Sequence, residues 1–238
     1  MSTIIKEIKL EALASSETDR IVLYKKFFKC IPGGYGEGDV FAGIRNPILR
    51  NLAKKYKTIA IDDVFTLLKD EIHEIRLLAL FILELKVKNK KITTIDFDSI
   101  AKGYIDNLDY VNNWDLVDAS AHHILGFWEF ENNSGILLKL SKESGLWKNR
   151  VAMIGTFYHI RKNEFELTLK IAEILINHKH DIIHKAVGWM LREIGNRNRE
   201  VELEFLNHYY KTMPRTMLRY AIEKFEEPLR LSYLKGLI

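Results

Sequence analysis

The sequence predicts an all-α fold made of repeated helices, and three observations support that prediction. Apolar residues recur with helical spacing along most of the chain, alternating strand-like runs are almost absent, and the 238 residues include only four prolines. Proline interrupts helices, so its scarcity suits a largely helical chain. We expect a single domain over residues 1–238: an α-solenoid of HEAT-like helical repeats with a concave basic face.

The apolar runs show where the helices should lie. Residues 75–85 (IRLLALFILEL) are apolar on nearly all sides, as expected of a helix buried between neighbours. Asn46-Pro47 is typical of a helix start, with proline in the first turn. Further helical patterns cover residues 64–68, 151–160, 167–176 and 182–191.

One segment departs from the helical pattern. Residues 31–44 (IPGGYGEGDVFAGI) hold five of the 13 glycines. Glycine at this density is typical of turns and of positive φ angles. We expect a mobile, surface-placed glycine-rich loop or short hairpin near residues 32–43, with Val40 and Phe41 forming one arm of the hairpin.

A basic residue precedes a small or apolar helical run at four places: Arg76, Arg150, Lys185 and Arg219. The last three of these residues are about 35 residues apart, and the interval from Arg76 to Arg150 is about twice as long. A residue halfway along that longer interval is Asn113. Such a period with two helices per unit is typical of an α-solenoid. These cations either line one face and contact phosphates or form salt bridges between helices, and the repeat alone does not decide between the two.

Composition narrows the class of protein. The formal net charge is +4 and the isoelectric point is near 8.9, which suits an acidic partner such as nucleic acid. A single cysteine, Cys30, excludes a disulfide within the chain and favours a reducing, cytoplasmic location. No apolar stretch is long enough to predict a membrane span, and the N-terminus does not resemble a signal peptide.

The most informative segment is YVNNWDLVDASAHHILG, residues 110–126. Asn113 is suited to cap a helix in which Trp114 and Asp118 share a face, while Asp115 lies on another side. Asp118 lies in an apolar run, where an unpaired carboxylate is costly. It is either a buried residue bonded to a neighbouring helix or a ligand-facing carboxylate beside an aromatic ring.

Two later segments place cations near aromatic rings. Arg150 follows Trp147 near the start of a helix, where it meets an anionic partner or pairs with Asp115 or Asp118. In HKAVGWMLRE, the side chains of Lys185, Trp189 and Arg192 share one helical face that could hold a phosphate backbone. Gly188 indicates a close approach by a helix or a ligand.

The chain resembles the DNA alkylation repair family of HEAT-like glycosylases in three segments, which occur in the order NNWDLVD, NRVA and HKAVGWMLRE. The similarity extends over residues 24–235 through three further segments: GEGDVFAGIRNPILRNLAKKY, HEIRLLAL and KTMPRTMLRYAIEKF. The resemblance implies that Asp118 is the catalytic carboxylate, that Trp114 and Trp189 hold the lesion nucleotide, and that Arg150 holds the phosphate backbone. The predicted DNA-binding residues are Arg150, Lys185, Arg192, Arg76, Arg45 and Arg219.

The resemblance further implies monofunctional hydrolysis of cationic N3- or N7-alkylpurine nucleotides in double-stranded DNA, without metal or cofactor. The glycine-rich segment departs from the family pattern, because some branches with inserted hairpins bind branched DNA with little glycosylase activity. The alternatives are therefore a non-catalytic module for branched or damaged DNA, or a protein-interaction scaffold. We expect a monomer in a bacterial-type, nucleoid-associated setting.

Overall fold

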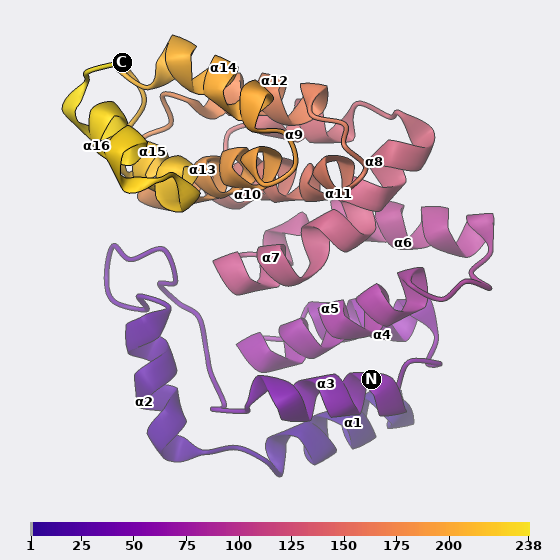
Figure 1. Ribbon diagram of the computed structural model, residues 1–238. Helices are drawn as coiled ribbons and strands as arrows, with labels where there is room; N and C mark the ends of the chain where they lie inside the picture. The colour runs from indigo at the N-terminus through magenta and orange to yellow at the C-terminus, as the bar shows by residue number, and fades with distance from the viewer. Residues whose placement is uncertain (1) are drawn as a thin grey trace. The chain divides into compact units, whose positions relative to one another are not determined.

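The computed structural model describes residues 2–238, and within that range all regular structure is helical and no strand forms (Figure 1). This confirms the all-α prediction. The chain divides into two compact units, of which the first ends at Ile124 and the second spans Leu125–Ile238. The prediction of a single domain over the whole chain stays a prediction.

The first unit is built of helices, most of which are connected by short turns. In chain order they are α1 (Thr3–Leu13), α2 (Thr18–Phe27), α3 (Asn46–Lys55), α4 (Ile61–Leu68), α5 (His73–Val87), α6 (Thr94–Asp106), η1 (Leu108–Tyr110) and α7 (Trp114–Ala121). The π-helical turn η2 (His122–Gly126) follows directly. In Figure 1, α2 stands at an angle to α3, and the glycine-rich segment leads from the end of α2 to the start of α3.

Helix α5 forms the core of the first unit. Every residue from His73 to Glu84 is buried, as the apolar pattern of residues 75–85 predicts. The helix packs on α3, α4, α6 and α7. Burying one leucine or isoleucine side chain contributes about 1.5–3 kcal/mol, so this helix accounts for much of the stabilisation of the unit. The polar residues at its N-terminus are therefore held in a rigid frame.

The glycine-rich segment is a loop, which is one of the two forms predicted for it, and it does not form a hairpin. Val40 does adopt an extended conformation, but it forms an isolated parallel bridge with Ile72, and its carbonyl accepts from the His73 amide at 2.8 Å. Gly33 and Gly38 are exposed with positive φ, whereas residues 41–44 are buried. Only the first part of the loop is thus placed at the surface, because its second part packs into the core.

The carboxylate of Glu74 fixes the second part of this loop. It accepts three consecutive backbone N–H groups, from Ala42 at 3.0 Å, Gly43 at 2.7 Å and Ile44 at 3.1 Å. Gly43 has a φ of +79°, and a Cβ there would lie 2.2 Å from the carbonyl oxygen of Glu17. Both the conformation and the space therefore require glycine at this position.

The second unit contains the remaining helices. They are α8 (Phe127–Asn132), α9 (Ile136–Lys142), α10 (Leu146–Gly155), α11 (Phe157–Arg161), α12 (Glu166–Leu175), α13 (Asp181–Gly195), α14 (Arg199–Tyr209), α15 (Arg215–Ala221), η3 (Ile222–Lys224) and α16 (Glu227–Lys235). Helix α13 packs on α10, α12, α14 and α15. A Cβ on Gly188 would lie 2.4 Å from the carbonyl oxygen of Met217, so the close approach at this glycine is made by helix α15.

The repeated basic residues occupy equivalent places in their helices. Arg76 is the fourth residue of α5, and Arg150, Lys185 and Arg219 are each the fifth residue of α10, α13 and α15. In α7 the fifth residue is Asp118, whereas Asn113 precedes the helix as its cap. The step that the sequence spacing assigns to Asn113 is therefore wrong, and a carboxylate replaces the cation in this repeat.

Candidate functional site

Helix α7 carries the two residues on which the functional prediction depends. Trp114 is its first residue and Asp118 its fifth, so their side chains lie one turn apart on the same face. Both residues are half-buried. The predicted cap at Asn113 is confirmed, because its side-chain oxygen accepts from the Trp114 amide at 2.9 Å.

Asp118 lies close to a buried tyrosine within the first unit. Burial raises the pKa of Tyr104, and the negative charge of Asp118 adds to that shift. The Tyr104 hydroxyl shares a 2.8 Å hydrogen bond with Ser120 Oγ, which also donates to the Leu116 carbonyl. Asp118 thus lies beside a hydrogen-bonded polar group, and its role as a catalytic residue stays a prediction.

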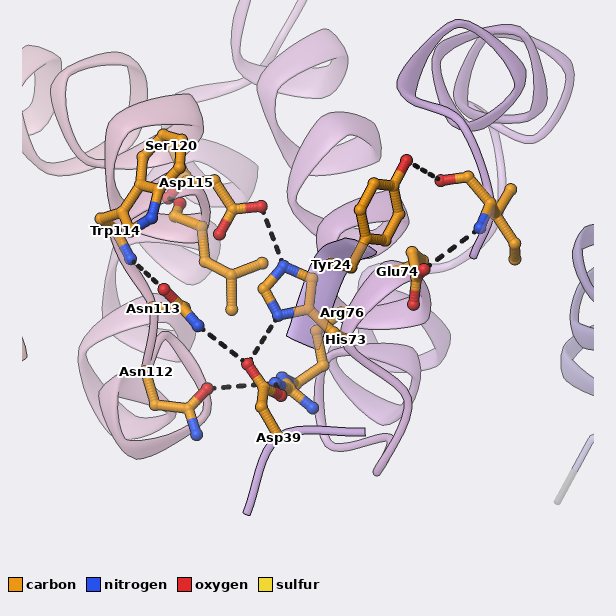
Figure 2. A network of polar contacts seen from close by, with 12 residues as sticks. Tyr24, Asp39, His73, Glu74, Arg76, Asn112, Asn113, Trp114, Asp115 and Ser120 are labelled. Atoms are coloured by element: carbon orange, nitrogen blue, oxygen red, sulfur yellow. Dashed lines mark hydrogen bonds and ion pairs between the residues drawn. The ribbon is translucent and has the colours of Figure 1, made fainter. Parts of the chain in front are cut away.

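The N-terminus of α7 is joined to α5 and to the glycine-rich loop by a buried polar network (Figure 2). His73 Nδ1 lies 2.8 Å from Asp39 Oδ2, and His73 Nε2 lies 2.8 Å from Asp115 Oδ2. Asp39 Oδ2 also accepts from Asn113 Nδ2 at 3.0 Å. Asp39 therefore contacts both the residue that caps α7 and the histidine that holds Asp115.

Arg76 completes this network. Its guanidinium donates to Asp39 Oδ1, to the Asn112 side chain at 3.2 Å, and to the carbonyls of Asp70 and Glu71 at 3.0 and 2.9 Å. The residue is only 4% exposed. Arg76 thus forms an ion pair with a carboxylate of the glycine-rich loop, whereas the alternative to phosphate contact was a salt bridge between helices.

The charges of this network balance one another. Burial alone would lower the pKa of His73, but the carboxylates of Asp115 and Asp39 raise it to about 9. Burial would raise the pKa of Asp39, but bonding to His73 and the charge of Arg76 lower it to about 2. At neutral pH two cations therefore face two carboxylates, and such compensation is what makes buried charge tolerable.

An aromatic cluster holds the Trp114 ring. Phe28 stacks on Trp114 with 5.4 Å between ring centroids, and Phe41 stacks on Phe28 at 5.0 Å. Phe27 meets the Trp114 ring edge-on at 5.6 Å, and His73 lies against Phe41 at 4.5 Å. Such packing fixes the orientation of Trp114 before any ligand binds.

Arg150 is a buried residue of the second unit. It is 5% exposed, and its Nη1 donates to the Ile182 carbonyl at 2.7 Å, which joins α10 to the first turn of α13. It is the fifth residue of α10, slightly farther into the helix than the sequence suggests. Its predicted contact with phosphate stays a prediction.

Lys185, Trp189 and Arg192 lie half-buried along α13, whereas the residues between them are mostly buried. Each of the three has a polar partner in the second unit: Lys185 pairs with Asp181 at 3.0 Å, Trp189 Nε1 donates to Glu193 at 3.2 Å, and Arg192 pairs with Glu223. Of the remaining predicted cations, Arg219 is exposed, and Arg45 is exposed while paired with Glu17 at 2.7 Å.

Sequence reasoning missed the network around His73 and the aromatic cluster. The only local signals were the paired asparagines before Trp114 and the polar residues at the start of an apolar helix (HEIR). Residues 39, 73 and 115 come from three separate segments, so no spacing in the sequence connects them.

Two further observations concern metal binding and membrane-spanning helices. Within residues 2–238, no group of three or more histidine, cysteine, aspartate or glutamate side chains is arranged to hold a metal ion. Over the same described range, no helix combines the length and the apolar character that crossing a bilayer requires.

Comparisons with known proteins identify the family. Residues 8–225 match the model of the family described as DNA alkylation repair enzyme. The chain is similar to a solved structure described as a predicted DNA alkylation repair enzyme from Enterococcus faecalis, with a TM-score of 0.68 and 17% sequence identity. The similarity covers 90% of this chain and 98% of that one, and it supports the fold. No curated protein matches. Because the family model covers most of its length, the chain belongs to the DNA alkylation repair enzyme family, which supports a role in DNA repair and implies DNA as its substrate.

Proposed function

We propose that the chain is a DNA glycosylase that hydrolyses the N-glycosidic bond of cationic N3- or N7-alkylated purine nucleotides in duplex DNA. The observation that carries the proposal is the position of Asp118, half-buried and one helical turn after Trp114 on a helix whose start is fixed by Asn113 and the His73 network. A catalytic carboxylate needs such a rigid setting, since its effect depends on its position.

The chemistry fits the residue types. As the N-glycosidic bond breaks, positive charge builds on the sugar, and an ionised Asp118 close to C1′ would stabilise that charge and orient the attacking water. The face of the Trp114 ring favours a cationic base through its quadrupole. An alkylated purine already has a good leaving group, so these two residues need no additional acid.

DNA contacts outside α7 belong to the same proposal. In the second unit, Trp189 would contact the lesion nucleotide, and Arg150, Lys185, Arg192 and Arg219 would contact the phosphate backbone. The exposed Arg219 is the most accessible of these cations, whereas Arg150 would need to reach phosphate from a buried position. The net charge of +4 supports binding to a polyanion.

The test is single-turnover release of base from methylated duplex DNA by the wild-type protein and by Asp118→Asn. Loss of one preorganised charged group costs roughly 100- to 1,000-fold in rate, so release should fall by about that factor while DNA affinity is retained. Asp109→Asn, at an exposed carboxylate of η1, removes the same charge and should leave the rate unchanged.

Melting temperature separates catalysis from a structural role of Asp118. A structural role would lower stability by about 1–3 kcal/mol and reduce activity only through unfolding. A folded Asp118→Asn protein that releases base at the wild-type rate would refute the catalytic role. Absence of release by the wild-type protein, with DNA affinity intact, would favour the alternative of a non-catalytic module for branched or damaged DNA.

A further inference from the structure

A cavity of about 710 Å³ lies at the other end of α5 from the His73 network. It is lined by the turn between α3 and α4, by the end of α5 with the turn that follows, and by α6, all within the first unit. At a rise of about 1.5 Å per residue, Lys86 lies about 20 Å along α5 from His73. The cavity is therefore separate from the site around Trp114, and its volume suits a small molecule.

Positive charge is in excess in the wall of this cavity. Four lysines line it: Lys57, Lys86, Lys88 and Lys91. Among the described residues of the wall, Asp96 alone is acidic. Lys88 is paired with Glu84 at 2.5 Å, so three lysines face one aspartate and two positive charges are in excess. A hollow lined by charges of one sign attracts ions of the opposite sign, which indicates an anionic ligand.

Two of the ammonium groups are unpartnered and accessible. Lysines that follow the end of a helix often bond its last carbonyls. Lys57 follows α3 and Lys91 follows α5, but within residues 2–238 their ammonium groups have neither a hydrogen bond nor an ion pair. Both residues are exposed, so a ligand in the cavity can reach them without any rearrangement of the chain.

Lys86 lies deeper in the wall. The residue is half-buried, and its Nζ donates to the carbonyl of Ile59 at 2.5 Å. Burial lowers the pKa of this amine, whereas the charge of Asp96 opposes that shift. An ammonium group has three N–H donors, so two donors of Lys86 remain for an anion.

The rest of the wall is largely aliphatic. Four half-buried apolar residues line the cavity: Ile59, Ile61, Leu85 and Ile92. Because they are only half-buried, part of each side chain is open to a ligand. Among the described residues of the wall there is no aromatic ring on which a nucleobase could stack. The wall therefore suits an aliphatic body, whose burial is favourable beside such side chains.

We propose that this cavity binds a small molecule that carries a phosphate monoester on an aliphatic body, with the phosphate beside Lys57, Lys86 and Lys91. Such a phosphate has a charge of about −1.5 to −2 near pH 7 and three acceptor oxygens, which matches the excess of two positive charges. A phosphodiester of DNA has only one negative charge. The proposal goes beyond the proposed function and does not depend on it.

The first test is calorimetric titration of the wild-type protein with methyl phosphate, n-hexyl phosphate and n-hexanol. Burying one methylene group improves affinity by about fourfold, so each methylene added between the methyl and hexyl compounds should tighten binding by up to that factor. Hexanol lacks the charge and should bind far more weakly than hexyl phosphate. Equal affinity for the two phosphates, or for hexanol and hexyl phosphate, would overturn the proposal.

The second test uses variants at the two unpartnered lysines. Lys57→Gln and Lys91→Gln each remove one exposed charge, which should weaken binding of hexyl phosphate by up to about fivefold each, and the double variant should lose more. Lys90→Gln is the matched control, because Lys90 is exposed on the same turn but does not line the cavity. Wild-type affinity in the double variant, or an equal loss in Lys90→Gln and Lys91→Gln, would overturn the proposal.

Two further measurements identify the source of the phosphate. Binding to phosphatidylcholine vesicles that contain phosphatidic acid, lost in the double variant, would support the site with a lipid headgroup as its source. Binding of hexyl phosphate without binding to these vesicles would support a soluble molecule. Displacement of hexyl phosphate by a short DNA duplex whose ends carry no phosphate would identify a contact with the DNA backbone instead, and would overturn the proposal.

Discussion

Replacing His73 tests the buried network most directly, because this residue bonds to two carboxylates from different segments. In His73→Gln the neutral amide can bond to only one of them, which leaves Asp39 and Asp115 without their shared cation. Removing one partner of a buried ion pair typically costs about 3–5 kcal/mol. The free energy of unfolding should therefore fall by that order at pH 7.

The pKa of His73 gives an independent value and a pH dependence. Its pKa is about 9 in the folded protein, against an ordinary value of 6.5, and each unit corresponds to about 1.4 kcal/mol, which gives about 3 kcal/mol. Because the folded pKa is raised, this stabilisation is complete below pH 6.5 and is lost as pH rises through 9. The lowered pKa of Asp39 arises from the same contacts, so the two shifts are not added.

Urea unfolding at several pH values between 6 and 9.5 measures both effects. The wild-type protein should lose stability across this range, and His73→Gln should be less stable at pH 6 and lose less as the pH rises. His208→Gln, at an exposed histidine, is the matched control and should follow the wild-type curve. Parallel curves for the wild type and His73→Gln would refute the assignment of a protonated, doubly bonded His73.

Two further predictions concern the second unit. Burial raises the pKa of Glu202 to about 8 despite the nearby Arg199, so the folded state favours the protonated carboxyl and the protein loses stability as pH rises from 4.5 through 8. Glu202→Gln should remove this loss, which thermal melts at pH 5 and pH 9 would detect. A difference in melting temperature between the two pH values that equals that of the wild type would contradict this prediction. If the exposed Arg219 contacts one phosphate, Arg219→Ala should reduce the salt slope of DNA affinity by about 1, and an identical slope would exclude that contact.

The helical architecture could be predicted from sequence because helix signals are local. The apolar run of residues 75–85 is a buried helix, Asn46 begins α3 with proline in its first turn, and Asn113 caps α7. The family followed from ordered motifs, and the comparisons confirm it. The roles of Asp118, Arg150 and the other predicted site residues stay predictions.

The glycine-rich segment was predicted as a loop, but its fixed conformation could not be predicted, because that conformation depends on distant residues. Its composition indicates mobility, yet Asp39 is held by His73 and Arg76, and residues 42–44 are held by Glu74. Neither partner can be recognised from the loop itself. The aromatic cluster around Trp114 has the same origin, since its rings come from the end of α2, the loop and α7 and meet only in the folded chain.

The hydrogen bonds between Glu74 and three loop amides have a consequence for the cooperativity of folding. Because the acceptor belongs to α5 and the donors belong to the loop, the first turn of α5 and the final conformation of the loop stabilise one another. The amide hydrogens of residues 42–44 should therefore exchange with solvent as slowly as those of α5, since they open only when the core opens. A stretch that is irregular by composition thus belongs to the same cooperative folding unit as the most buried helix.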